Sequence, residues 1–296
     1  MALEREEPRP TPAALRRPRL GVVIGSGSIK CVSALGFLRV LRREKIPVDL
    51  VVGCSAGGIY ASGLALGWDL DELERKSYET WQGLFARLDY RGLIQGLLPG
   101  LFRGRGVAGL LDERRLKAAL GSLFGETTFQ DASIPLYIVA TDLKTGESVV
   151  LSQGRLIDAV RASIAIPVLL RPVAIGGRLL FDGAASDPLP ISVAIREGCD
   201  IILAMGFESP LHERVESLMS LVSQTTCITI NNLLKSTYSF YSAAHHAEIV
   251  PIIPSFDRHI GLRDSTLLPY IIERGEEAAV KQLPFLKRLL AVPDGN

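Results

Sequence analysis

Short apolar runs alternate with amphipathic stretches over most of the chain. Apolar runs that are rich in β-branched side chains and end at glycine or a turn predict buried strands. The predicted strands are 20–25 (LGVVIG), 49–53 (DLVVG), 136–141 (LYIVAT), 148–152 (SVVLS), 171–175 (RPVAI), 178–182 (RLLFD) and 200–206 (DIILAMG). Apolar side chains at helical spacing predict helices, which stop near proline or glycine. The predicted helices are 32–41, 59–66, 156–164 and 190–197.

Strands that alternate with helices imply a parallel sheet that is covered on both faces. We therefore expect an α/β fold with three layers, α/β/α, and a mostly parallel central sheet. Gly176 and Gly177 separate two predicted strands, and a two-residue glycine connection is typical of a hairpin.

Three segments differ from this alternation. The first 19 residues mix charge with proline and contain no apolar run, which predicts a disordered tail and not a signal peptide. Residues 84–111 are apolar, rich in glycine and punctuated by arginine, which indicates a mobile cap. Residues 213–290 are mainly helical, with a short strand near 251. We expect residues 20–296 to form one domain.

Composition excludes several classes of protein. The chain has 33 basic and 32 acidic residues and a net charge of +1, so it lacks the electrostatic footprint of a nucleic-acid-binding protein. Its four cysteines are scattered without a C-x-x-C pair, which predicts reduced, buried thiols in a cytoplasmic protein and no metal site. The uncharged stretches 50–68 and 217–234 are interrupted by glycine or polar residues, so neither predicts a transmembrane helix.

Ser55 lies in the sequence GCSAG (53–57), between a predicted strand and a predicted helix. Ligands of α/β sheets gather at the carboxyl ends of strands. A G-x-S-x-G sequence at such an end forms a sharp elbow, in which small residues let strand and helix pack closely while the hydroxyl stands exposed. The helix N-terminus favours negative charge developing nearby. The context favours a nucleophile, and a plain glycine-rich turn is the competing interpretation.

A serine nucleophile needs a base, and histidine is the usual one. The chain has four histidines, His212, His245, His246 and His259, and none follows an identifiable late strand. Each is predicted to be a surface or helix-packing residue. Asp182 is the better candidate because it ends a predicted strand and opens into Gly-Ala-Ala.

The sequence GSGSIK (25–30) follows the first predicted strand and precedes a helix. It lacks the third glycine of a dinucleotide-binding loop and the G-K-[ST] of a P-loop. A loop of main-chain N–H groups at a helix start can bind phosphate or form an oxyanion hole. Its position beside a serine elbow favours the oxyanion hole.

These motifs together resemble the patatin-like phospholipase family. GSGSIK (25–30), GCSAG (53–57) and DGA (182–184) follow in the family's order, with ATDLKTGE (140–147) and ASIAIP (162–167) between the last two. The resemblance covers roughly residues 20–210.

The resemblance implies a Ser–Asp dyad in place of a triad. Ser55 would be the nucleophile and Asp182 its general base. The oxyanion amides would come from Gly25, Ser26, Gly27 and Ser28. Lys30 occupies the position where the family carries Arg or Lys, and the motifs are supported by Gly53, Gly57 and Gly183. The implied activity is hydrolysis of carboxylic esters of acyl lipids through an acyl-enzyme, without a metal or an organic cofactor.

The chain departs from the family pattern in its glycine-rich loop. Ser26 and Ser28 replace two glycines, and Cys31 stands where the last glycine is expected. A serine would be strained at any of these positions that needs a positive φ.

Several alternatives stay open from the sequence. They are an acyltransferase on the same fold, a catalytically weakened lipid-binding or regulatory protein, and a serine esterase with a histidine triad. The apolar segments 84–111 and 233–244 would line an acyl channel, touch a membrane or form ordinary core helices. We expect an acyl lipid or ester as the substrate, no nucleic-acid partner, and a cytoplasmic protein with peripheral membrane contact.

Overall fold

The computed structural model describes residues 17–84, 111–208, 211, 215–216, 218–261 and 264–291. The predicted cap lies outside the described residues except at its two ends, and so do residues 1–16 of the predicted tail. Residues 17–19 of that tail form hydrogen bonds with the rest of the described chain. The Arg17 guanidinium donates to Asp49 at 2.7 Å, and the Arg19 N–H donates to Asp200 at 2.7 Å.

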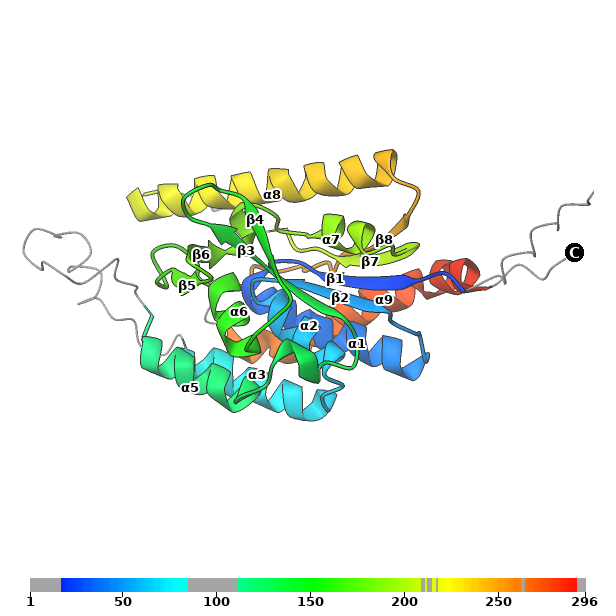
Figure 1. Ribbon diagram of the computed structural model, residues 1–296, viewed down its shortest axis with the longest axis horizontal. Helices are drawn as coiled ribbons and strands as arrows, with labels where there is room; N and C mark the ends of the chain where they lie inside the picture. Colours follow the sequence, from blue (N-terminus) through cyan, green and yellow to red (C-terminus); the bar gives the residue numbers. More distant parts are fainter. Residues whose placement is uncertain are drawn as a thin grey trace, which may run out of the picture.

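Within the described chain, eight strands form one sheet at the centre of the molecule (Figure 1). They are β1 (Leu20–Ile24), β2 (Leu50–Cys54), β3 (Leu136–Asp142), β4 (Ser148–Leu151), β5 (Val173–Ile175), β6 (Arg178–Asp182), β7 (Ile201–Met205) and β8 (Glu248–Ile252). The order is β5-β6-β3-β2-β1-β7-β8, and β4 also pairs with β3. The five strands from β3 to β8 in this order run parallel, whereas β4, β5 and β6 pair antiparallel.

Helices cover both faces of the sheet (Figure 1). The helices of one side are α1 (Ala34–Arg43), α2 (Gly57–Ala65), α3 (Leu70–Leu84), α5 (Glu113–Phe124), α6 (Leu156–Ser163) and α9 (Leu268–Leu290). The helices of the other side are α7 (Ile191–Arg196) and α8 (Leu218–Ala244). Four short 3₁₀ turns connect elements in the described chain: η1 (Ser28–Ser33), η2 (Phe129–Asp131), η3 (Gly183–Ala185) and η4 (Ser265–Leu267). The predicted three-layer α/β/α architecture is therefore confirmed.

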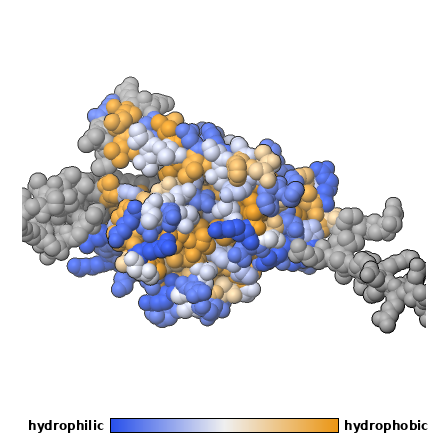
Figure 2. Space-filling view, turned by 45° about the horizontal axis from the view of Figure 1, so that its top comes forward, coloured by the Kyte–Doolittle hydropathy of each residue, from blue (hydrophilic) through white to orange (hydrophobic). Residues whose placement is uncertain are grey.

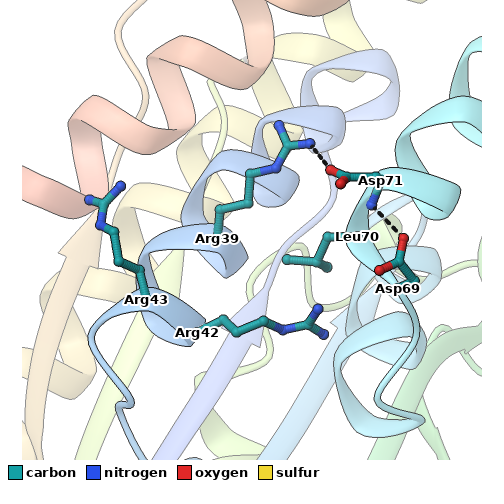
Figure 3. Close-up of a pocket in the computed structure, with 6 residues that line it drawn as sticks. All are labelled: Arg39, Arg42, Arg43, Asp69, Leu70 and Asp71. Atoms are coloured by element: carbon teal, nitrogen blue, oxygen red, sulfur yellow. Dashed lines mark hydrogen bonds and ion pairs between the residues drawn. The ribbon is translucent and has the colours of Figure 1, made fainter.

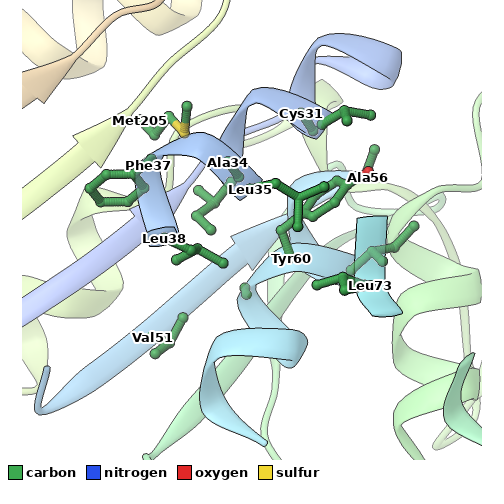
Figure 4. Packing of buried hydrophobic residues seen from close by; sticks show 14 of the residues in the cluster. Cys31, Ala34, Leu35, Phe37, Leu38, Val51, Ala56, Tyr60, Leu73 and Met205 are labelled. Atoms are coloured by element: carbon green, nitrogen blue, oxygen red, sulfur yellow. The ribbon is translucent and has the colours of Figure 1, made fainter. Parts of the chain in front are cut away.

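The central strands are apolar throughout because both of their faces are buried. Val22 and Ile24 of β1 belong to the core on the α1 side, while Val23 between them belongs to the core on the α7 side. Figure 4 shows the first of these cores, where Leu35 and Leu38 of α1 lie over the sheet beside Tyr60 of α2. This two-sided burial explains the continuous apolar runs that predicted a parallel sheet.

Two helices, α3 and α5, were not predicted. Each begins at an aspartate that accepts hydrogen bonds from the first turn. Asp69 accepts from the N–H of Glu72 at 2.9 Å, and Asp112 accepts from the N–H of Arg114 at 2.9 Å. Aspartate is a preferred N-cap residue, so the sequence did contain the signal for both helix starts.

Strands β2 and β6 meet end to end along one edge of β3. Strand β4 pairs with Ile138–Thr141 of β3 and therefore occupies the opposite edge from both of them. Cys54, the last residue of β2, is paired with Val139, and Asp182, the last residue of β6, is paired with Ala140. Because consecutive residues of β3 pair with these two strand ends, the residues that end β2 and β6 must lie close together.

Candidate active site

Ser55 stands in a tight turn between β2 and α2. Its φ is +54°, a left-handed conformation that is uncommon for a residue with a side chain. The flanking glycines are required by close packing. A Cβ on Gly53 would lie 2.5 Å from the Cα of Gly58, and a Cβ on Gly57 would lie 2.4 Å from the carbonyl oxygen of Gly25. The turn thus has the shape of a nucleophile elbow.

The structure brings Ser55 and Asp182 into direct contact, although they lie 127 positions apart in the sequence. The Ser55 hydroxyl donates a hydrogen bond to Asp182 Oδ2 at 2.8 Å. Both residues are 4% exposed. A hydroxyl hydrogen-bonded to a carboxylate in a dry environment has the geometry expected of a nucleophile and its base.

Main-chain and side-chain groups surround Asp182. Its Oδ1 accepts the N–H of Ala184 at 2.9 Å, and its carbonyl oxygen accepts the hydroxyl of Thr141 at 2.8 Å. Burial raises the pKa of Asp182 to about 6, and the hydrogen bonds from Ala184 and Ser55 oppose that rise. Gly183 is required beside it, because a Cβ there would lie 2.3 Å from the carbonyl oxygen of Val139. A carboxylate with this pKa is ionised at neutral pH and a stronger base than an exposed aspartate.

The loop 25–28 runs beside the elbow. Ile24 is paired with Gly53 in the parallel register of β1 and β2, so the residues that follow both strands emerge side by side. The N–H of Gly25 donates to the carbonyl of Met205 at 2.9 Å, and the N–H of Ser26 donates to the carbonyl of Pro188 at 2.8 Å. These two amides are already engaged.

The N–H groups of Gly27 and Ser28 donate to no other group in the part of the chain that the structure describes. Of the four predicted oxyanion donors, Gly27 and Ser28 are therefore the two whose N–H groups are free to bind an oxyanion. Ser28 has a φ of +53°, so one of the two serines that replace family glycines does occupy a left-handed position. Ser26 does not.

Of the residues that follow β7, Phe207 packs against the loop 25–28 and Glu208 hydrogen-bonds to Lys30. A Cβ on Gly27 would lie 2.4 Å from the ring of Phe207. Lys30 is buried, and its Nζ donates to the carbonyl of Glu208 at 2.6 Å. Burial lowers the pKa of Lys30. Lys30 therefore ties the loop to the end of β7 and does not contact Ser55.

Cys31, which stands where the family resemblance predicts a glycine, lies directly beneath the loop. Its thiol is fully buried and contacts the carbonyl oxygen of Gly25 at 3.4 Å. Burial raises the pKa of this thiol well above its usual value, and the neighbouring Asp182 carboxylate adds to the rise. All four cysteines are unpaired, and Cys227 is the one that is partly exposed.

The described histidines lie away from the pair. His245, His246 and His259 are exposed, and none bonds to Ser55 or Asp182. His212 lies outside the described residues. Since Asp182 touches the serine hydroxyl directly, no imidazole stands between them, as a histidine triad would require.

Sequence reasoning missed two residues that hold the pair in place. Ser163 accepts a hydrogen bond from the Ser55 N–H at 2.7 Å, and Thr141 contacts the main chain of Asp182. Both lie inside motifs that carried the family resemblance, ASIAIP and ATDLKTGE, so their positions were visible although their contacts were not.

Two hollows of the described surface are lined by neither Ser55 nor Asp182. One, of about 320 Å³, lies between α1 and the start of α3 (Figure 3). Its arginines are engaged: Arg39 bonds Asp71, Arg42 bonds the carbonyl of Trp68, and Arg43 bonds Glu276. Since α1 ends at Arg43 and leads into the start of β2, this hollow lies toward the amino ends of the strands, away from Ser55.

The family model of the patatin-like phospholipases matches residues 22–195, a stretch that contains the elbow, the loop and Asp182. The chain belongs to the patatin-like phospholipase family.

Several known proteins are similar to this chain. An uncharacterized NTE family protein of Mycobacterium tuberculosis is 29% identical over 240 residues, which are 79% of this chain and 62% of that protein. Lysophospholipase NTE1 of Scheffersomyces stipitis is 26% identical over 198 residues, 64% of this chain and 12% of that protein. The chain spans less than two thirds of the length of these curated relatives.

Among solved structures, VipD from Legionella pneumophila is similar with a TM-score of 0.49 and 17% identity. The similarity covers 91% of this chain and 67% of that chain.

Proposed function

We propose that this protein is a serine acyl hydrolase that cleaves carboxylic esters of lipids through an acyl-enzyme. The observation that carries the proposal is the 2.8 Å hydrogen bond from the Ser55 hydroxyl to the buried Asp182 carboxylate. The serine is the nucleophile, and the aspartate is its general base. Family membership supports a lipid ester as the substrate.

The first half of the reaction forms the acyl-enzyme. Asp182 Oδ2 takes the hydroxyl proton while Ser55 Oγ bonds to the ester carbonyl carbon. The carbonyl oxygen becomes an oxyanion, and the N–H groups of Gly27 and Ser28 are the donors that remain to stabilise it. The tetrahedral intermediate then collapses. The alcohol or lysolipid leaves with the proton that Asp182 returns to it.

The second half releases the acid. A water molecule enters beside Asp182, which takes one of its protons while the oxygen attacks the acyl carbon. Collapse of the second intermediate frees the fatty acid, and the proton returns to Ser55 Oγ. Asp182 carries every proton of the proposed cycle, and main-chain N–H groups stabilise the oxyanion through hydrogen bonds, so the proposed cycle uses no cofactor.

The substrate class that we propose is a lipid with one or two acyl esters. One similar protein carries the name lysophospholipase, which makes a lysophospholipid a suitable first substrate. The same acyl-enzyme would pass its acyl group to an alcohol or thiol if such an acceptor outcompeted water. Product analysis with and without added acceptor alcohol separates hydrolysis from transfer.

We further propose that the molecule meets lipid through an exposed apolar surface while residing in the cytoplasm. Several apolar side chains of α8 are exposed, namely Leu221, Val222, Ile228 and Phe240. Figure 2, in which the α8 side is turned forward, shows apolar patches between polar side chains on this face. Among the helices that the structure describes, none combines the length and the hydropathy of a membrane span. Unpaired thiols support a reducing compartment.

Labelling with a fluorophosphonate tests the proposed chemistry. The probe should modify Ser55 of the wild type, and peptide mapping should locate the adduct there. Ser55→Ala should abolish both labelling and turnover of p-nitrophenyl esters, and Asp182→Asn should reduce both by at least about 10³-fold. A wild-type protein that neither labels nor turns over any ester of a lipid panel would contradict the proposed hydrolase and favour the alternative of a catalytically weakened lipid-binding or regulatory protein.

A further inference from the structure

The end of helix α6 contacts the main chain of both Ser55 and Asp182. The Ser55 N–H donates to Ser163 Oγ at 2.7 Å, and the Asp182 N–H donates to the carbonyl of Ala165 at 3.2 Å. Ser163 and Ala165 are two residues apart, so one short turn binds both members of the proposed dyad. This turn lies in ASIAIP (162–167), a motif to which the proposed reaction assigns no role.

The Ser163 hydroxyl has its single proton committed elsewhere. Ser163 Oγ donates to the carbonyl oxygen of Val139 on β3 at 2.5 Å. Ser163 Oγ can therefore only accept a hydrogen bond from Ser55, and the Ser55 N–H is a donor that needs an acceptor. Ser163 is completely buried, so no water is available to replace it.

The hydrogen bond from the Ser55 N–H to Ser163 lies at the strained residue of the elbow. Ser55 holds a φ of +54°, and a residue with a side chain keeps such a conformation only when its surroundings determine it. Without an acceptor at Ser163, the Ser55 N–H would be a buried donor without a partner. The turn would then relax toward a conformation that satisfies this group, and Oγ would move with it.

The turn after Ser163 is itself fixed by main-chain bonds. The N–H of Ile164 donates to Val160 at 3.0 Å, and the N–H of Ala165 donates to Ala162 at 3.1 Å. Both dyad contacts therefore share one rigid support. A rigid support of this kind sets the distance between two catalytic groups that come from different strands.

We infer that Ser163 is a positioning residue, whose hydroxyl holds the Ser55 elbow so that Oγ stays within hydrogen-bond distance of Asp182. The inference rests on the proposed function, because it assigns a role toward the proposed nucleophile. Ser163 neither touches substrate nor transfers a proton.

Two substitutions remove the acceptor in different ways. Ser163→Ala leaves a small space, while Ser163→Cys fills it with a thiol that accepts hydrogen bonds weakly. The matched control is Ser62→Ala. Ser62 is also completely buried, and its Oγ donates to the carbonyl of Gly58 at 2.7 Å without contacting Ser55.

The measurement is kcat per active site on a p-nitrophenyl ester, with sites counted from fluorophosphonate labelling at saturation. Counting sites removes any loss that is due to unfolded protein. Both Ser163 variants should lose about 10- to 100-fold in kcat per labelled site, because a displacement of about 1 Å is enough for such a loss. KM should change by less than about two-fold, and Ser62→Ala should keep the wild-type kcat per site.

The outcomes separate the inference from the proposed function. A wild type that does not label overturns the dyad itself. A labelled wild type together with an unchanged kcat per site in Ser163→Ala or in Ser163→Cys overturns the positioning role alone. An equal loss in Ser62→Ala would assign the effect to general loss of packing and would also overturn it.

Discussion

Asp182 Oδ2 lies 2.8 Å from Ser55 Oγ in a place where both side chains are almost completely shielded from water. The charged carboxylate keeps two hydrogen bonds there, one from Ser55 and one from the Ala184 N–H. Two bonds do not replace the hydration that the carboxylate would have in water, so burial raises its pKa to about 6. The basicity of the proposed general base follows from its burial.

The rate should therefore rise with pH around pH 6. Only ionised Asp182 can accept the Ser55 proton, so kcat/KM should fall about ten-fold for each unit of pH below about 6 and level off above about 7. The measurement is the pH profile of p-nitrophenyl ester hydrolysis, followed by absorbance at a pH-independent wavelength. A profile that is flat between pH 5 and 8 would exclude Asp182 as the base.

Asp187 is the control for this profile. Burial raises its pKa to about 6 as well, but its carboxylate bonds to Ser192 and not to Ser55. Asp187→Asn should therefore keep the ascending limb. Loss of the limb in this variant would assign the titration to Asp187 and contradict the first prediction.

Because Asp182 is buried, its ionisation should lower the free energy of unfolding at neutral pH. Its folded pKa of about 6 lies above the ordinary value of 3.8, so the folded state holds the proton between these values while the unfolded state releases it. The free energy of unfolding should consequently fall as pH rises from about 4 to about 6, and the loss should persist above that range. Asp182→Asn should remove this loss.

We expect Asp182→Asn to exceed the wild type in free energy of unfolding by about 2–3 kcal/mol at pH 8, a difference that vanishes near pH 4. Urea unfolding at the two pH values measures it. Asp158→Asn provides the matched control, because it makes the same substitution at an exposed position where no carboxylate is buried. A variant less stable than the wild type at pH 8 would contradict the sign of the effect.

Ser28 and Ser26 provide a matched pair in the loop 25–28, the proposed oxyanion loop. Ser28 has a φ of +53°, which glycine adopts without strain, whereas Ser26 lacks a positive φ. Ser28→Gly should raise the free energy of unfolding by about 0.5–1 kcal/mol, and Ser26→Gly should lower it by a similar amount. Both variants keep the main-chain N–H, so ester turnover by Ser28→Gly should stay within about three-fold of the wild type. Equal stability changes in the two variants would contradict the assignment of strain to Ser28.

Much of the fold was predictable because the strands are buried on both faces. Continuous apolar runs marked β1, β2 and β7, and the paired glycines 176 and 177 marked the turn between β5 and β6. Both of these glycines have positive φ angles, +56° and +76°, as a primed hairpin turn requires.

The two strand ends that meet at the site were predictable for the same reason. Ser55 follows an apolar strand, and Asp182 ends another. Their contact was a matter of register, since it depends on Cys54 and Asp182 pairing with consecutive residues of β3. A single sequence specifies the strand ends without specifying which of them are neighbours.

The sequence could not predict which N–H groups of the loop 25–28 are free to bind an oxyanion. The acceptors that engage the amides of Gly25 and Ser26 are the carbonyl oxygens of Met205 and Pro188, which come from a distant part of the chain. Every residue has a main-chain carbonyl, so the sequence does not indicate which carbonyl accepts a given hydrogen bond. The organisation of residues 20–296 as one catalytic domain, with a cap at 84–111, remains a prediction.

The packing of Gly27 against Phe207 offers a test of the proposed oxyanion donors, the N–H groups of Gly27 and Ser28. A Cβ at position 27 would lie 2.4 Å from Cδ2 and 2.6 Å from Cγ of the Phe207 ring, closer than real Cβ atoms come. Phe207 is buried, so its ring has little room to move away, and the loop must shift instead. Gly27→Ala should therefore displace the N–H groups of Gly27 and Ser28 and lower kcat by about 10²–10³-fold.

A second substitution on the other side of the contact should restore part of this loss. Phe207→Ala removes Cδ2 and Cγ, the two atoms nearest to the new Cβ, and leaves the milder contact with the Cβ of residue 207 at 2.9 Å. The double variant should therefore recover part of the loss, about ten-fold in kcat per labelled site over Gly27→Ala. Such recovery would be possible only if the damage in the single variant comes from the clash and not from the loss of glycine itself. Double-variant activity no higher than that of Gly27→Ala would show that this contact does not position the oxyanion donors.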